Sequence, residues 1–129
     1  MIEVYIDGAS AGDPGLSGAG IYIKNNGKTE SFSIPLGRMN NHEAEFHALI
    51  KSLEICIDRG YSIVSVRSDS TAVVDAVEKE FARNQKYRLL LNNALSLSSQ
   101  IELFFIKWIP SKENKHADHL ARQAIQLNT

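Results

Sequence analysis

Short apolar runs and longer stretches with helical hydrophobic spacing follow one another along this chain. Five runs rich in apolar and β-branched residues predict strands, at 2–7, 18–25, 28–35, 62–68 and 101–109. Four stretches predict helices, at 41–59, from residue 70 or 71, at 84–97, and from residue 113 or 114. The Asn26-Gly27 pair between the second and third strands favours a tight hairpin. This order predicts a mixed α/β fold that begins with an antiparallel meander.

Composition bounds the class of protein. The 129 residues are 43% hydrophobic and contain no linker-like tract, which predicts a single domain over residues 1–129. No apolar run approaches the roughly 20 residues of a membrane span, and no signal-like segment opens the chain, so we expect a cytoplasmic protein. Cys56, the single cysteine, lies among apolar residues and is expected to be buried and unreactive. The net charge of −1 leaves nucleic-acid binding to local patches.

The candidate functional side chains are four carboxylates, Asp7, Glu45, Asp69 and Asp118. Asp7 ends the apolar run 2–6 and Asp69 ends the run 63–68, so both are predicted at strand ends, where a side chain can face a ligand. Glu45 and Asp118 are spaced so that each borders the buried face of its helix near the N-terminal end.

Each helical carboxylate has a simpler explanation, because an acidic residue near a helix N-terminus interacts favourably with the helix dipole by about 0.3–1 kcal/mol. The set of four favours a metal centre instead. Converging carboxylates repel one another and raise one another's pKa, and a divalent cation neutralises such a cluster. Hard oxygen ligands favour Mg²⁺ or Mn²⁺.

Four ordered motifs contain these carboxylates: Asp7-Gly8-Ala9-Ser10, Asn41-His42-Glu43-Ala44-Glu45-Phe46, Ser68-Asp69-Ser70 and Ala117-Asp118-His119-Leu120-Ala121. They resemble the motifs of type 1 ribonuclease H, and most of all those of its compact prokaryotic subgroup. The resemblance spans residues 2 to about 125 and includes a Trp-Ile-Pro segment at 108–110. It implies a ribonuclease H-like fold, a five-stranded mixed sheet with its first three strands antiparallel and helices on both faces.

The resemblance also implies a chemistry, hydrolysis of the RNA strand of an RNA–DNA hybrid to 5′-phosphate and 3′-hydroxyl products. Two Mg²⁺ or Mn²⁺ ions would be the only cofactors, with no organic cofactor. By similarity, Asp7 would bridge both ions and Asp118 would help to hold the ion that activates water. Glu45 and Asp69 would hold the ion on the leaving-group side.

The expected partner is therefore the RNA–DNA hybrid duplex. We expect the protein to be a monomer and not to bind a membrane. Small residues in the glycine-rich turn let the backbone approach a duplex closely. Asn40 and Asn41 have turn formation and helix capping as an alternative role. The substrate-binding candidates are Gly8, Ser10, Gly12, Asn40, Asn41, Ser70 and Thr71.

Two departures from the family pattern keep other functions open. Residues 109–115 lack the loop histidine that many relatives carry, and residues 81–100 lack a basic insertion. The main alternative is a ribonuclease H-like module that binds nucleic acid or protein with little or no catalysis. A third possible function is that of another nuclease or an integrase-like enzyme of the same fold class. His42, His47, His116 and His119 are expected to carry no chemistry.

Overall fold

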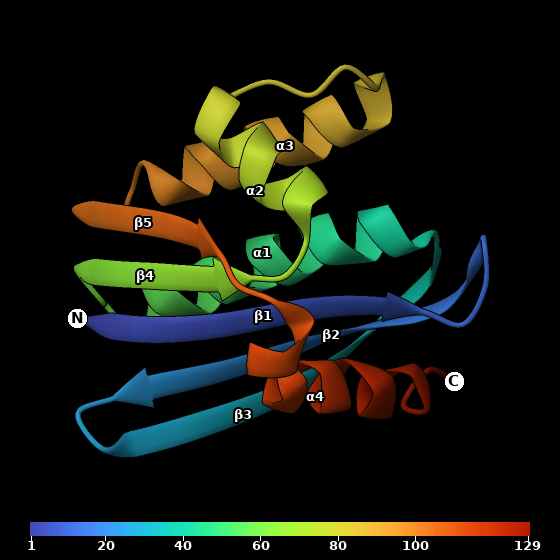
Figure 1. Ribbon diagram of the computed structural model, residues 1–129, viewed down its shortest axis with the longest axis horizontal. Coiled ribbons are helices and arrows are strands. Elements are labelled where there is room, and N and C mark those ends of the chain that lie inside the picture. Colours follow the sequence, from blue (N-terminus) through green and yellow to red (C-terminus); the bar gives the residue numbers. More distant parts are fainter.

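The computed structural model describes residues 1–129 as one sheet with helices packed on it (Figure 1). Every predicted strand and helix is present. The elements are β1 (Ile2–Ser10), β2 (Gly15–Asn25), β3 (Lys28–Met39), α1 (Asn41–Asp58), β4 (Ile63–Ser68), α2 (Thr71–Lys79), α3 (Gln85–Ser98), β5 (Leu103–Trp108), the short 3₁₀ helix η1 (Ser111–Glu113) and α4 (Lys115–Ile125).

The sheet has the strand order β3-β2-β1-β4-β5. β1 and β3 each run antiparallel to β2, whereas β4 runs parallel to β1 and β5 parallel to β4. Helix α1, with α2 and α3 beside it, covers one face, and α4 covers the β1–β3 part of the other (Figure 1). The predicted mixed sheet with helices on both faces is confirmed. None of the helices combines the length and apolar character needed to cross a membrane.

The two faces of the sheet are packed differently. On the α1 face, large side chains such as Ile6, Phe46 and Leu53 are almost fully buried. On the α4 face the packing is close, because a Cβ added at Gly20 would collide with the backbone of Ala117. Glycine at this position therefore lets the first turn of α4 lie directly on the strands, which fixes where that turn presents its side chains.

Three strands extend further than predicted, and one of them is β2, which begins at Gly15 and not at residue 18. β1 continues to Ser10 and β3 continues to Met39, so Asp7 lies inside a strand and not at its end. The residues after Asp7 are small and do not show the alternation of apolar and polar residues that predicts a strand. They nevertheless pair in register with residues 17–19 of β2, which are equally small. Only backbone hydrogen bonding reveals this extension.

Candidate metal centre

The structure brings the four predicted carboxylates to one hollow of about 350 Å³, although they come from four different elements. Asp7 is on β1, Asp69 follows the last residue of β4, and these two strands are parallel neighbours with Ile6 opposite Ser68. Glu45 comes from the start of α1 and Asp118 from the start of α4. The side chains therefore meet where two strands and two helix N-terminal ends converge.

Close backbone packing between β1 and α1 positions Glu45. A Cβ at Gly8 would collide with the backbone of Ala44, so only glycine lets the first turns of α1 approach β1 this closely. The start of α1 is fixed by a capping box, in which the Asn40 side chain accepts from the N–H of Glu43 at 2.8 Å and the Glu43 carboxylate accepts from the N–H of Asn40 at 3.0 Å.

The electrostatics of the hollow are those of crowded carboxylates. Burial, followed by the negative charges of Asp69, Asp118 and Glu45, raises the pKa of Asp7 to about 8. Burial also raises the pKa of Glu45, although His42 and Ser70 act in the opposite direction. Ionising all four groups together is therefore unfavourable unless a positive charge is present.

Two basic side chains already contact this cluster. His42 Nδ1 lies 3.0 Å from Glu45 Oε1, and Arg122 Nε donates to both Asp118 oxygens at 3.2 and 3.1 Å. Arg122 also lines the hollow, which the sequence did not predict. The available signal was helical spacing, because residues three or four apart share a helix face. His42 is exposed and makes this contact, whereas the sequence left it without a role.

The residues present fit a hard divalent cation by their chemistry. In the present side-chain arrangement no three His, Cys, Asp or Glu side chains form a ready coordination group. The donor set around the hollow nevertheless consists of carboxylate oxygens, which are the ligands that Mg²⁺ and Mn²⁺ prefer. A cation placed among them would favour the ionised form of Asp7 and reverse the rise of its pKa.

The predicted substrate-binding residues divide into two groups. Gly8, Ser10 and Asn41 line the same hollow as the carboxylates. Gly12, Asn40, Ser70 and Thr71 do not line it, and two of them have local roles: Asn40 caps α1 and Ser70 caps α2. The Ser10 hydroxyl also has local partners, since it donates to the backbone oxygen of Met39 at 2.9 Å. Contact of these residues with substrate stays a prediction.

Comparison with known proteins identifies relatives along almost the whole chain. A family model described as reverse transcriptase-like matches residues 5–124. A protein of Enterococcus faecalis named "Putative hydrolase EbsB" is 41% identical over 98% of this chain and 95% of its own length. Ribonuclease HI of Halobacterium salinarum is 31% identical over 96% of this chain, which spans 64% of that enzyme.

Solved structures give the same picture. The crystal structure of ribonuclease H1 from Halobacterium salinarum superposes with a TM-score of 0.92 at 29% identity and covers 98% of both chains. LC11 ribonuclease H1 in complex with an RNA/DNA hybrid superposes with a TM-score of 0.90 at 27% identity, again over 98% of both chains. The fold and its strand order are therefore shared over the full length of these chains.

Proposed function

Since this chain belongs to the ribonuclease H-like family that the reverse transcriptase-like model describes, we propose that it is a metal-dependent endonuclease acting on RNA–DNA hybrids. It would cut the RNA strand and leave 5′-phosphate and 3′-hydroxyl ends. The observation that carries this proposal is the hollow lined by Asp7, Glu45, Asp69 and Asp118. Burial together with this crowding raises the pKa of Asp7 to about 8, an arrangement that suits a site that binds cations.

The four carboxylates would hold two Mg²⁺ or Mn²⁺ ions, and such a pair supplies activation of a water and stabilisation of the leaving oxygen. Asp7 is the residue whose pKa is raised by the charges of all three others, which makes it the centre of the cluster. Arg122 is placed to balance charge at Asp118, and the His42 ring lies within hydrogen-bond distance of Glu45. Arg122 occupies both Asp118 oxygens, so this pair would rearrange if Asp118 bound a cation.

The hybrid is the substrate that the family and the hollow support together. A relative with the same fold has been crystallised with an RNA/DNA hybrid. In the present chain, Gly8 and Ser10 place backbone beside the carboxylates, and Asn41 adds a side-chain amide. Backbone and amide groups of this kind can hydrogen-bond 2′-hydroxyls across a wide minor groove, which distinguishes the RNA strand from DNA.

A second candidate is a module that binds nucleic acid without useful turnover. Two observations favour it: residues 109–115 contain no histidine, and Arg122 pairs with both oxygens of Asp118. A guanidinium held by a carboxylate that should bind metal lowers the affinity for that metal. The intact set of four carboxylates favours the enzyme over this alternative.

Incubation with end-labelled hybrid, duplex RNA and duplex DNA separates the two candidates, with Mg²⁺ and Mn²⁺ tested separately. We expect cleavage of the RNA strand of the hybrid and little or no cleavage of duplex DNA. Asp75→Asn, an exposed change on α2, is the matched control and should retain full activity. Protein that binds the hybrid but cuts it with neither metal supports the binding module, and protein that does neither contradicts both candidates.

A further inference from the structure

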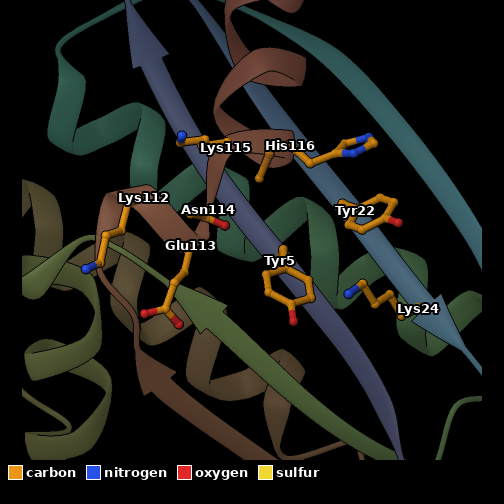
Figure 2. A pocket seen from close by; sticks show the side chains of 9 residues that line it. Tyr5, Tyr22, Lys24, Lys112, Glu113, Asn114, Lys115 and His116 are labelled. Atoms are coloured by element: carbon orange, nitrogen blue, oxygen red, sulfur yellow. The ribbon is translucent and has the colours of Figure 1, made fainter.

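Figure 2 shows a second hollow, of about 230 Å³. We call it the tyrosine pocket, and it is lined by Tyr5, Tyr22, Lys24 and residues 112–117. Tyr5 and Asp7 are two residues apart on β1, so their side chains share one face of the sheet, about 7 Å apart along the strand. Ser111 lines the carboxylate hollow and the next residue, Lys112, lines the tyrosine pocket. A nucleic-acid strand that leaves the carboxylate hollow can therefore pass over the tyrosine pocket.

Aromatic rings form one wall of the tyrosine pocket. Tyr22 stacks on His116 with ring centroids 3.9 Å apart and planes 15° apart, and Tyr5 lies tilted against Tyr22 at 6.0 Å. The Lys24 ammonium lies 5.2 Å from the Tyr5 ring centroid and 5.8 Å from that of Tyr22 (Figure 2). Cation–π contacts at exposed sites are weak, so this ammonium can move to an anion and uncover its side of the two rings. His116 stays stacked on Tyr22, and the Arg67 guanidinium lies 5.6 Å from the Tyr5 ring centroid.

The charge of the tyrosine pocket differs from that of the whole chain. Three lysines, Lys24, Lys112 and Lys115, line it against the single carboxylate of Glu113, although the protein as a whole has a net charge of −1. Flexible ammonium groups beside aromatic rings are the combination that binds unpaired nucleotides, because bases stack on the rings and phosphates pair with the ammonium groups.

The amide oxygen of Asn114, a residue that lines the tyrosine pocket, lacks a hydrogen-bond partner. Asn114 donates through Nδ2 to the backbone oxygen of Ile6 at 2.8 Å, and this bond fixes the orientation of the amide. Its Oδ1 is buried and has no hydrogen-bond partner. A buried acceptor without a partner is unfavourable, so any donor that reached this oxygen would be favoured.

The size of the tyrosine pocket limits what it can hold. Pockets for complete small-molecule ligands usually measure roughly 300–1,000 Å³, and this one is smaller, at about 230 Å³. It is therefore suited to one planar group of a longer chain.

We propose that the tyrosine pocket binds one unpaired nucleotide of a single-stranded extension that leaves the hybrid, with its base on the tyrosine rings and its phosphates near the lysines. This inference rests on the proposed function, because it assumes that the carboxylate hollow holds the hybrid. Its consequence is a preference for hybrids that continue into single strand over blunt ones.

The test compares the affinity of the metal-free protein, in EDTA at low salt, for a blunt hybrid and for hybrids with a short extension at each strand end in turn. The extension carries 2-aminopurine, whose fluorescence falls when it stacks. We expect one extended hybrid to bind roughly tenfold more tightly than the blunt one, as stacking of a single base predicts. Fluorescence should fall on binding.

Matched variants assign the effect to the tyrosine pocket. Lys24→Gln should reduce the preference to about threefold through loss of one phosphate contact. Lys28→Gln, at another exposed lysine of the same hairpin, should leave the preference unchanged. Tyr22→Leu should abolish both the preference and the fluorescence change, and its melting temperature checks that it still folds. Because Lys24 is exposed, Lys24→Gln gives a decisive result even if Tyr22→Leu does not fold.

The outcomes separate this inference from the proposed function. Equal affinity for blunt and extended hybrids in a protein that cuts hybrids overturns the inference alone. A preference that Lys24→Gln and Tyr22→Leu both retain also overturns it, because the extension then binds elsewhere. If the protein neither binds nor cuts hybrids, a 2-aminopurine single strand decides: a fluorescence loss that depends on Tyr22 supports the pocket, and no loss contradicts it.

Discussion

Replacing Asp7 by asparagine is expected to stabilise the metal-free protein at alkaline pH. Burial and the charges of neighbouring carboxylates raise the pKa of Asp7 from 3.8 to about 8. Between about pH 4 and pH 8 the folded protein therefore holds a proton that the unfolded chain has released. The free energy of unfolding must fall as pH rises through this window, and Asp7→Asn removes the effect.

The structure sets the size of this effect. The difference between a pKa of 3.8 and one of about 8 corresponds to at most about 6 kcal/mol of unfolding free energy. The hollow is open to water and its carboxylates can move apart, so we expect about 2 kcal/mol. For a chain of this length, that stabilisation raises the melting temperature by about 5–10 °C.

Urea unfolding in EDTA at about pH 5 and about pH 9 measures this prediction. The parent should lose stability between the two values, whereas Asp7→Asn should change much less, and the exposed Asp75→Asn should follow the parent. Added Mg²⁺ or Mn²⁺ should stabilise the parent at about pH 9 and have little effect on Asp7→Asn. Parallel pH dependence in parent and Asp7→Asn would refute the reasoning from charge crowding.

Three further predictions follow from single residues. His116→Ala and His119→Ala should each keep hybrid cleavage within about tenfold of the parent, below about 1.4 kcal/mol in the barrier, and a thousandfold loss would make that histidine catalytic. Gly8→Ala should lower the melting temperature by several degrees, because its Cβ collides with the backbone of Ala44; an unchanged melting temperature contradicts this close packing. Burial raises the pKa of Cys56 to about 11, so a thiol reagent should label the native protein only as fast as it unfolds.

Much of the fold was predictable from local signals in the sequence. Gly60 has a φ of 69° just after the end of α1, and Asn84 caps α3, as their residue types suggest. The ends of β1 and β3 were not predictable, because the small residues around Ser10 and the segment before Met39 carry no strand pattern. Pairing with β2 defines those ends, and pairing is a property of the assembled sheet.

The four carboxylates of the candidate site were predictable from the sequence, whereas the side chains that surround them were less predictable. Motif order and helical spacing located Glu45 and Asp118, and the structure places both at the hollow with the two strand aspartates. The Arg122 pair with Asp118 depends on side-chain conformation, which spacing permits but does not determine. The proximity of Tyr5 to residues 112–117 depends on how α4 packs on the sheet, and no local pattern encodes it.

The central claim is that the four carboxylates form a metal centre that cuts RNA in a hybrid. It is tested most directly by comparing binding and cleavage of one labelled hybrid by the parent, Asp7→Asn and Asp118→Asn, with analysis of the product ends. We expect the parent to release fragments with 5′-phosphate and 3′-hydroxyl ends only when Mg²⁺ or Mn²⁺ is added. Both variants should bind the hybrid at low salt and cut it at least a thousandfold more slowly, about 4 kcal/mol in the barrier. Cleavage by either variant at the parent's rate, or cleavage by the parent in EDTA, would contradict the account.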